Sequence, residues 1–582
     1  NTVTSHQANL IYKGSFFDGG EKLTLKNSTG VIIDEVSCTS KWFAGRNAYN
    51  KETMERKSAE VSGSESGNWQ NTPMAVWQGQ DVNGTYIAGT PGLPNSSVTY
   101  LDGILTADRT LSAGTYFLGN FSIPVGKTLR INPGVKIIGS VSSNIKVSGK
   151  LEILGTVDNP VFFTSYKESG LSNNVYLQDS NWGYIQILSG GQADIKNVQF
   201  NFGNSKWENS RPKGLIYADN ATLNLDGVIF DKNLNERPRG NVPLINSSNS
   251  SLEIKNSQFL NSPKGLVAKG GSLNLSGNNF DGLGLSAVES EDLEEAVIEN
   301  NTFNDLGWDY MDPVREYWER PSPLLSPVSF KNFLPEKIKG NTFENNILNS
   351  WEVYGKLAAS GKIDTLGETA AIMGMLEIPA GINLEIKEGS IIKMPPNHSL
   401  KVFGSLLSRG GEGSGQIVFT SLHDDEYGGD VDLAEQQTTQ KEGNEWAQIL
   451  IQSSEPSVLD NTLVRFANAA TAADTEGSVF VGGAPFSANN LSIEYSRVPS
   501  IALHLKDATG MVINGCFIKN ENKRAFDPGA YNDGSGIWIN GGNPQISNCV
   551  IDTFNFGLRL NPESQPELSN MEYKNVDFDV GL

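Results

Sequence analysis

The sequence predicts an all-β protein in which short strands stack as successive coils of a parallel solenoid. Three observations support this fold class: a short apolar motif recurs along most of the chain, a longer segment is duplicated, and apolar residues alternate within each motif. Alternation with a period of two turns one face of each segment inward, as in a strand and not a helix. For a chain of 582 residues we therefore expect stacked coils rather than several globular cores.

A motif of the form apolar-x-apolar-x-Asn/Gly-x-x-Phe recurs from about residue 195 onward. Its Asn or Gly tolerates the left-handed backbone of a sharp corner, so we expect it between two strands. Each strand would then pair with the coil above and below, which is a parallel β-helix. The first copies are Ile195–Phe200, Leu225–Phe230, Ile254–Phe259, Leu275–Phe280, Ile298–Phe303 and Ile338–Phe343. Weaker copies are Leu459–Phe466, Leu491–Val498, Val512–Phe517, Ile546–Ile551 and Leu568–Tyr573.

A longer duplication overlies these short repeats. The stretch Ile123–Ser165 has the same order of motifs as Ile378–Ser421, and in each copy a Phe-Thr-Ser strand precedes a variable loop and a tryptophan. The matching pairs, offset by 255 to 264 residues, are Pro124 with Pro379, Gly149 with Gly404, Thr164 with Thr420, and Trp182 with Trp446. We therefore predict two β-helix blocks, residues 99–358 and 359–582.

This order of motifs resembles the right-handed parallel β-helix repeat proteins of bacterial surfaces and secretomes. The resemblance covers about 480 residues and implies a right-handed β-helix in a secreted or cell-surface protein. It leaves the function open, because this scaffold carries adhesins, polysaccharide lyases, glycoside hydrolases and purely structural proteins.

Residues 1–98 lack the coil pattern and form a separate predicted domain. Their motifs are Leu23-x-Leu, Gly30-x-x-x-Asp, Met54-Glu-Arg, Asn68-Trp and Gly89-Thr-Pro-Gly. This series resembles the second half of a lamin-tail domain, a small immunoglobulin-like β-sandwich of bacterial extracellular proteins. The opening strands of that family do not precede it, so we expect a partial sandwich with unpaired edges and a chain that is a fragment of a longer one.

Charge and cysteine usage exclude several classes of function. The formal net charge of −21 argues against a nucleic-acid partner, because phosphate binding needs a cationic surface. No apolar run approaches the length of a membrane-spanning helix. Three cysteines exclude a disulfide framework or a Cys-rich metal site. Cys516 and Cys549 occupy equivalent places in neighbouring coils, which favours a stacked apolar pair, with a disulfide or a reactive thiol as the alternative.

An acidic loop follows the second Phe-Thr-Ser strand. Carboxylates around a flexible Gly-Gly turn are hard oxygen ligands, which suit Ca²⁺, although their spacing differs from an EF-hand. The candidate ligands are Asp424, Asp425, Glu426, Asp430 and Asp432. The alternative is a solvated acidic loop without metal. We expect no other cofactor.

A long insertion separates Phe303 from Ile338 and is rich in aromatic and acidic residues. The predicted stacking platform for sugar rings consists of Trp308, Tyr310, Tyr317 and Trp318. Asp309, Asp312, Glu316 and Glu319 could bind hydroxyl groups or act as acid and base. The alternative is a short amphipathic helix that packs its aromatic side chains on the flank of the β-helix.

Together these features favour a non-catalytic extracellular protein with a structural or adhesive role at the cell surface and a polysaccharide as its ligand. The alternative is a secreted polysaccharide-degrading enzyme, a glycoside hydrolase or lyase, whose site lies beside the insertion or the acidic loop. The sequence does not indicate an oligomeric state.

Overall fold

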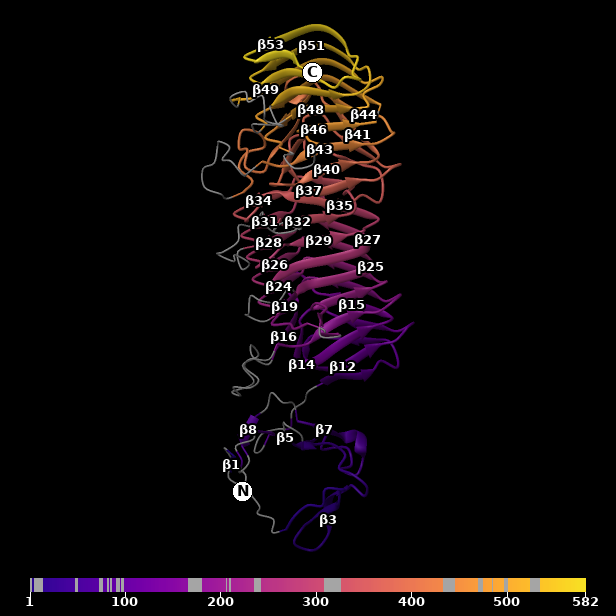
Figure 1. The fold of residues 1–582 in the computed structure, drawn as a ribbon. Helices are drawn as coiled ribbons and strands as arrows, with labels where there is room; N and C mark the ends of the chain where they lie inside the picture. Colours follow the sequence, from indigo (N-terminus) through magenta and orange to yellow (C-terminus); the bar gives the residue numbers. More distant parts are fainter. Residues whose placement is uncertain are drawn as a thin grey trace. The chain divides into compact units, whose positions relative to one another are not determined.

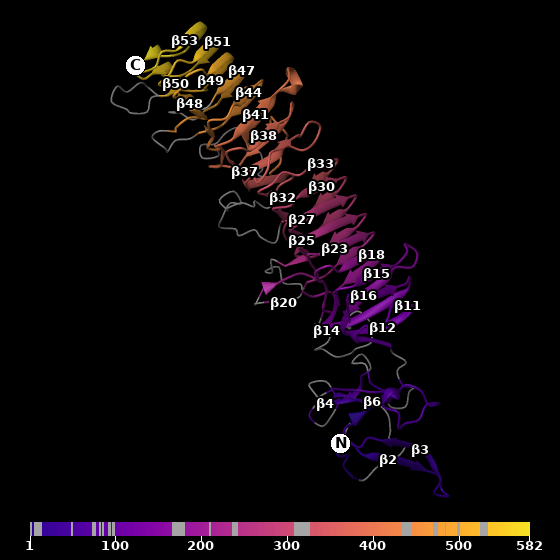
Figure 2. The ribbon, with the colours of Figure 1, turned by 90° about the vertical axis from the view of Figure 1, so that its right-hand side faces the viewer.

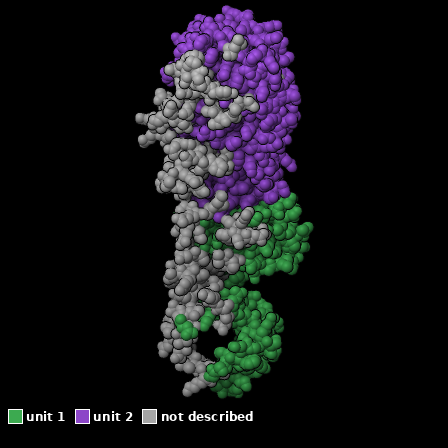
Figure 3. Space-filling view, in the orientation of Figure 1, with its two compact units in different colours: residues 1–236 green, residues 237–582 purple. Residues whose placement is uncertain are grey.

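The computed structural model describes all of the chain except residues 1–2, 5–13, 48–50, 73–76, 81–82, 84–85, 91–94, 96–98, 166–180, 206, 209–210, 235–241, 308–325, 433–444, 469–474, 484, 497–500, 524–533 and 582. The chain divides into two compact units, residues 1–236 and 237–582 (Figure 3). Each unit is described separately. The predicted boundaries at residues 98 and 358 stay predictions.

The first ninety residues form small sheets of short strands (Figure 1). Five strands make one sheet in the order β1-β8-β9-β5-β4, and β2-β3 and β6-β7 are two antiparallel pairs. The bounds are β1 Val3–Thr4, β2 Lys22–Lys26, β3 Ile32–Ser37, β4 Arg46–Asn47, β5 Lys51–Glu52, β6 Met54–Arg56, β7 Trp69–Asn71, β8 Trp77–Gln80 and β9 Tyr86–Ala88. A short 3₁₀ turn, η1 Ser66–Asn68, precedes β7.

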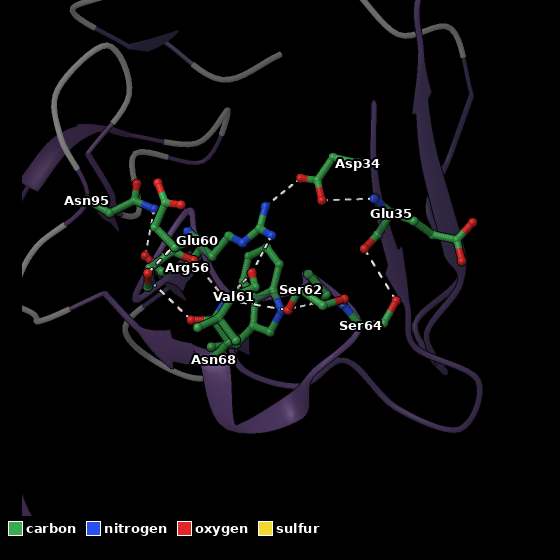
Figure 4. A network of polar contacts seen from close by, with 12 residues as sticks. Asp34, Glu35, Arg56, Glu60, Val61, Ser62, Ser64, Asn68 and Asn95 are labelled. Carbon is green, nitrogen blue, oxygen red and sulfur yellow. Dashed lines mark hydrogen bonds and ion pairs between the residues drawn. The ribbon is translucent and has the colours of Figure 1, made fainter. Parts of the chain in front are cut away.

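The motif residues of this region meet in one polar network (Figure 4). The Arg56 guanidinium donates to Asp34 and to the carbonyl oxygen of Val61, and its hydrogen bond to Asp34 lowers the pKa of that carboxyl group. The Asn68 amide donates to the carbonyl oxygens of Ser58 and Val61, at 2.9 Å each. Side chains from β3, β6 and η1 thus join the β2-β3 pair to the β6-β7 pair.

The β2-β3 hairpin leaves apolar side chains in solvent. Ile33 is 63% exposed, and Leu25, Val31 and Ile32 are also more than half exposed. The described residues therefore cover this face only in part, and polar contacts such as those of Arg56 stabilise the hairpin instead.

The remainder of the first unit consists of parallel strands. Strand β13 pairs with β15, β15 with β18, and β18 with β23, each one coil further along. The bounds are β10 Thr99–Ile104, β11 Arg109–Leu111, β12 Gly114–Ile123, β13 Thr128–Ile131, β14 Val135–Val147, β15 Lys150–Leu154, β16 Val161–Ser165, β17 Tyr184–Ile187, β18 Gln192–Lys196, β19 Val198–Asn201, β22 Ile216–Asp219, β23 Thr222–Asp226 and β24 Ile229–Asp231. A separate hairpin joins β20 Trp207–Glu208 and β21 Arg211–Pro212.

The second unit repeats this arrangement, and its successive strands lie in order along the stack (Figure 2). The bounds are β25 Pro243–Lys255, β26 Gln258–Leu260, β27 Lys264–Ser276, β28 Asn279–Asp281, β29 Val288–Glu291, β30 Glu295–Glu299, β31 Thr302–Asn304, β32 Val328–Lys331, β33 Lys337–Lys339, β34 Thr342–Glu344, β35 Trp351–Lys356, β36 Gly361–Ile363, β37 Ala371–Ile378, β38 Asn383–Ile386 and β39 Ile391–Met394. They continue as β40 Ser399–Val402, β41 Ser405–Arg409, β42 Ile417–Ser421, β43 Gln448–Gln452, β44 Ser457–Asp460, β45 Thr462–Arg465, β46 Val479–Gly482, β47 Phe486–Glu494, β48 Ile501–Lys506, β49 Val512–Lys519, β50 Ser535–Asn540, β51 Gln545–Asp552, β52 Phe556–Leu560, β53 Glu567–Lys574 and β54 Phe578–Gly581. This confirms the predicted all-β parallel β-helix.

The recurring phenylalanine of the motif forms the core ladder. In the second unit Phe259, Phe280 and Phe303 are fully buried and lie in register. Their ring centroids are 4.5 and 5.1 Å apart, and the rings are stacked. In the first unit Phe200 and Phe230 stack at 5.3 Å. Each phenylalanine therefore packs on its equivalent in the neighbouring coil.

The Asn or Gly of the motif adopts the predicted left-handed conformation. Asn197 (φ 46°) and Gly227 (φ 66°) occupy this corner in the first unit. In the second unit Gly277 (φ 65°), Asn300 (φ 55°) and Gly340 (φ 64°) do the same. Asn and Gly are the residues for which this region costs least, so the corner explains why the motif alternates between them.

The two copies of the duplication adopt the same local geometry in their own units. A Cβ added to Gly149 would lie 2.3 Å from the carbonyl oxygen of Pro124, and one added to Gly404 would lie 2.3 Å from that of Pro379. Both glycines are therefore required by the close approach of the backbone. The indole of Trp182, in the first unit, donates to the carbonyl oxygen of Asn201 at 2.9 Å.

The two cysteines of the later coils form a disulfide. Cys516 of β49 pairs in register with Cys549 of β51, and their Cα atoms are 4.4 Å apart. The expectation of an unbonded apolar pair was therefore wrong, because parallel strands in register bring equivalent side chains within bonding distance. Cys38 is a buried free cysteine.

Helical segments are short wherever the structure is described. Besides η1, a 3₁₀ turn η4 spans Gly413–Gly415. None of the helices within the described residues has the length and hydropathy needed to cross a membrane.

We expect Asn300→Ala to lower the free energy of unfolding by about 1–2 kcal/mol, because alanine carries the Cβ penalty of the left-handed region. Asn300→Gly is the matched control and should be close to neutral, since glycine adopts φ 55° without that penalty. Urea unfolding followed by far-ultraviolet circular dichroism would measure both. Equal stability of the two variants would contradict the corner assignment.

Candidate functional site

The acidic loop folds back onto an earlier coil of the same unit. It follows β42, and its end forms an antiparallel bridge between Asp432 and Leu348. The backbone N–H of Asn349 also donates to the carbonyl oxygen of Val431 at 2.7 Å. Beneath the bridge lies a buried apolar cluster of Ile347, Leu348, Ile372, Leu422 and Val431. The loop therefore connects the coil after β34 to the coil after β42.

A buried arginine, Arg465, forms ion pairs with two carboxylates of this loop. Arg465 ends β45 and is only 4% exposed. Its guanidinium lies 3.2 Å from Asp424 and 2.8 Å from Glu426. The guanidinium carbon also lies 4.9 Å from the ring centre of Tyr427 and 5.1 Å from that of Tyr495. Carboxylates and aromatic faces thus compensate the removal of the cation from water.

A buried lysine, Lys393 of β39, forms hydrogen bonds with the backbone of the same loop. Its ammonium group donates to the carbonyl oxygens of Asp424, at 2.9 Å, and Gly429. Burial lowers the pKa of Lys393, and the nearby carboxylates, Asp425 first, oppose that effect. The lysine thereby ties the start of the loop, at Asp424, to the Gly-Gly turn at Gly429.

The loop contains two further internal contacts. The imidazole of His423 contacts the carboxylate of Asp432, and both side chains are buried. The Thr420 hydroxyl donates to Asp424. Together with Arg465 and Lys393, these contacts define what we call the loop clamp, which joins the acidic loop to the coils on both sides of it.

The loop clamp uses carboxylates that the sequence predicts as Ca²⁺ ligands. Asp424 and Glu426 contact Arg465, and Asp432 contacts His423. Burial raises the pKa values of Asp425 and Asp430, and a neighbouring carboxylate raises each further, Asp430 for Asp425 and Asp432 for Asp430. Among the described residues, no group of three or more His, Cys, Asp or Glu side chains is arranged to hold a metal ion. The Ca²⁺ site stays a prediction.

The predicted aromatic platform, Trp308, Tyr310, Tyr317 and Trp318, lies outside the described residues. The same is true of Asp309, Asp312, Glu316 and Glu319, and of residues 166–180, the first-copy counterpart of the acidic loop.

A second candidate site lies at a left-handed corner of the later coils. Asparagines form a ladder there: the Asn490 amide donates to Asn461 at 3.0 Å, and the Asn570 amide donates to Asn548 at 2.7 Å. Gly515 takes the corner position of the intervening coil, with φ 75°. A Cβ on Gly515 would lie 2.6 Å from the Asn490 side-chain oxygen. The corner position of this coil therefore carries no amide rung, and the Asn548 amide donates instead to the side-chain oxygen of Asn514, the residue before Gly515, at 2.8 Å.

Beside the missing rung lies a hollow of about 490 Å³, which we call the amide groove. Its side-chain lining is Glu412, Gln416, Asn461, Asn490, Ser492, Cys516, Phe517 and Asn548. Phe517 is 39% exposed, and the residue in register below it is the small Ser492, which leaves that side of the ring uncovered. The disulfide of Cys516 fixes the coil that carries the missing rung. The groove combines amides, a hydroxyl and an open aromatic ring.

Sequence reasoning missed both Arg465 and the amide groove. Arg465 follows Val464, which is in register with Phe419, so it takes the position that directly follows the motif phenylalanine. Earlier motifs have Asn, Asp, Leu or Glu at that position, so a cation there was the available signal. For the groove, the signal was the series Asn461, Asn490, Gly515 and Asn548 at one recurring position. A glycine among asparagines marks a gap in a surface ladder.

No protein-family model and no curated protein matches the chain. Among solved structures, the catalytic domain of a GH87 alpha-1,3-glucanase in complex with tetrasaccharides is similar over 82% of this chain and 68% of that one, with 12% identity and a TM-score of 0.18. A hyper-glycosylated TibA fragment is similar over 82% of this chain and 99% of that one, with 11% identity and a TM-score of 0.13. At these TM-scores the likenesses carry no argument about function.

We expect Arg465→Met to lower the free energy of unfolding by about 3–5 kcal/mol, because it leaves the buried Asp424 carboxylate without its cation. Adding Asp424→Asn should recover part of that loss. Arg409→Met, at an exposed arginine, is the control. Thermal unfolding would measure stability, and hydrogen exchange of residues 422–432 would measure loop order. Unchanged exchange of the loop in Arg465→Met would contradict the clamp.

We expect Asp430→Asn to raise the melting temperature at pH 7. Burial raises the pKa of Asp430 above the ordinary 3.8, so the folded state holds this proton more tightly than the unfolded chain. Ionisation of Asp430 therefore costs stability above the raised pKa. The gain of the variant should shrink as the pH falls through that pKa towards 3.8. Melting curves in Ca²⁺-free buffer would measure it, with Asp158→Asn at an exposed position as the control.

The wild type and Asp430→Asn also test the predicted Ca²⁺ site. A rise of melting temperature on adding Ca²⁺ to the wild type, lost in Asp430→Asn, would support a Ca²⁺ site in the loop. No shift in either protein would exclude it.

Proposed function

We propose that this protein is a non-catalytic extracellular protein that binds a neutral glycan through the amide groove. The observation that carries the proposal is the ligand-sized hollow beside the missing rung at Gly515, which lies between amide side chains and the open ring of Phe517. Side-chain amides both donate and accept hydrogen bonds, as sugar hydroxyl groups do. An uncovered aromatic ring offers apolar contact to the C–H face of a sugar.

The charge of the groove favours a neutral ligand. Glu412 is the only ionisable group among its described lining residues. An acidic glycan needs cations to compensate its carboxylates or sulfates. The net charge of −21 would also repel such a polymer.

The same lining favours binding over hydrolysis. Most glycoside hydrolases place two carboxyl groups on opposite sides of the scissile bond, one as acid and one as base or nucleophile. Here Glu412 is the single carboxylate among the described residues that line the groove. A groove of this composition can orient a sugar without cleaving it.

The disulfide supports the extracellular part of the proposal. Disulfides persist in oxidising compartments and are rare in the cytosol. The Cys516–Cys549 bond lies next to the missing rung. The proposal therefore includes a location at the cell surface, with adhesion to a polysaccharide or a structural role.

We expect Gly515→Asn to abolish binding of neutral oligosaccharides, because its Cβ would lie 2.6 Å from the side-chain oxygen of Asn490, so that the new side chain must displace this lining residue of the groove. Asn tolerates the left-handed corner and occupies it in the neighbouring coils. Gly510→Asn is the matched control: its φ is 75°, and a Cβ there meets nothing within 4 Å. Calorimetry with short gluco-, manno- and xylo-oligosaccharides would measure binding, with uronate oligomers as the charged comparison.

Three outcomes would contradict the proposal. The first is that Gly515→Asn and Gly510→Asn bind equally well. The second is that uronate oligomers bind while neutral ones do not. The third is that new reducing ends or unsaturated products appear on incubation, which would establish the polysaccharide-degrading alternative.

A further inference from the structure

The asparagine ladder beside the amide groove has a direction. The side-chain nitrogen of Asn490 donates to the side-chain oxygen of Asn461, one coil earlier, at 3.0 Å. The side-chain nitrogen of Asn570 donates in the same sense to Asn548 at 2.7 Å. In both pairs the nitrogen faces the preceding coil, and the oxygen that accepts faces the following one. A rung between Asn490 and Asn548 would therefore have to donate a hydrogen bond to Asn490.

The side-chain oxygen of Asn490 faces the coil that carries no rung. A Cβ on Gly515 would lie 2.6 Å from this oxygen, so the oxygen lies directly over the glycine. None of the described residues donates a hydrogen bond to it. Asn490 is exposed and lines the amide groove, so a ligand in the groove can reach the oxygen. A ligand group that donates there makes the hydrogen bond that the ladder makes elsewhere.

Asn548, on the other side of Gly515, offers a donor. Its side-chain nitrogen carries two hydrogens, and one of them is donated to the side-chain oxygen of Asn514 at 2.8 Å. Within the described part of the chain no acceptor takes the second hydrogen. The groove thus presents an acceptor on one side of Gly515 and a donor on the other. A secondary amide is complementary to this pair, because its N–H and its C=O point in opposite directions.

An open aromatic ring distinguishes this corner from a similar one. Phe517, two residues after Gly515, is 39% exposed and lines the groove. At the other corner, a Cβ on Gly340 would likewise lie 2.5 Å from the side-chain oxygen of Asn300, but Thr342 stands two residues later. The Gly515 corner therefore combines partners for an amide with an apolar surface for a group attached to that amide.

We propose that the amide groove selects glycans that contain N-acetylated hexosamine residues. This inference rests on the proposed function, because it names the sugar that the same groove binds. The acetamido N–H donates to the side-chain oxygen of Asn490, and the acetamido carbonyl oxygen accepts from the side-chain nitrogen of Asn548. The acetamido methyl group lies against the ring of Phe517. The sugar stays uncharged, as the lining of the groove favours.

Three β-1,4-linked tetrasaccharides with one backbone test the selection, because they differ only in the group at C2. The group is acetamido in the N-acetylglucosamine tetramer, hydroxyl in the glucose tetramer and a protonated amine in the glucosamine tetramer. Calorimetry on the full chain would measure the three affinities. We expect the acetamido tetramer to bind at least about tenfold more tightly than either of the others, since it adds hydrogen bonds and an apolar contact.

Asn490→Gly tests the acceptor. Glycine adopts the φ of 54° found at this corner without strain, so the variant loses the side-chain oxygen and keeps the backbone. It should reduce the preference for the acetamido over the hydroxyl tetramer at least about fivefold. Asn575→Gly is the matched control, because Asn575 is exposed at another left-handed corner, with φ 50°, and does not line the groove. It should keep the preference of the wild type.

The outcomes separate this inference from the proposed function. Equal affinity for the acetamido and hydroxyl tetramers would overturn the inference and leave the proposed function standing. Tighter binding of the amine tetramer would also overturn it, because the charge of Glu412 would then decide the selection. Binding of neither neutral tetramer would contradict both. An unchanged preference in Asn490→Gly, or an equal loss of preference in Asn575→Gly, would overturn the role of the Asn490 oxygen and with it the inference.

Discussion

In-register pairing of each strand with its equivalent one coil away is the constraint on which the rest of the structure depends. Parallel pairing places equivalent positions above one another, so where the motif keeps its phenylalanine each ring meets the ring of the next coil, as Phe280 meets Phe303. The backbone groups of a strand form hydrogen bonds with the coils on its two sides. The length of the loops can therefore vary, whereas the position of the strands cannot. The same rule aligns Cys516 with Cys549 and builds the amide ladder on the surface.

The loop clamp compensates the burial of two cationic side chains. Burying Arg465 and Lys393 removes two cations from water, and such burial is tolerated only when hydrogen bonds and opposite charges replace the solvent. Here carboxylates of one loop and backbone carbonyl oxygens do so. Its bridge to Leu348 attaches the later coils to the segment that follows β34. Contacts of one loop thus join coils that are not consecutive in the stack.

The sequence was sufficient for those features that depend on neighbouring residues or on a repeat. The alternation of apolar residues predicted the strands, and the Asn and Gly positions predicted the left-handed corners. The offset of about 255 residues between the two copies predicted that Gly149 and Gly404 are equivalent. It could not give the contact between Arg465 and Asp424, which lie 41 residues apart and meet only because a loop folds back. The cysteine pair was located correctly but assigned the wrong bonding, since spacing alone does not give the distance between two coils.

The disulfide has a mechanical consequence for a protein built of stacked coils. A pulling force applied at the end of such a stack peels one strand at a time, because each coil is held only by its neighbours. The covalent link between Cys516 and Cys549 joins β49 to β51, so coils beyond β51 can detach while these two remain attached. Peeling from that end would halt at the bond, and the coil carrying Gly515 and Phe517 would keep its shape under a load that had already unravelled β53 and β54.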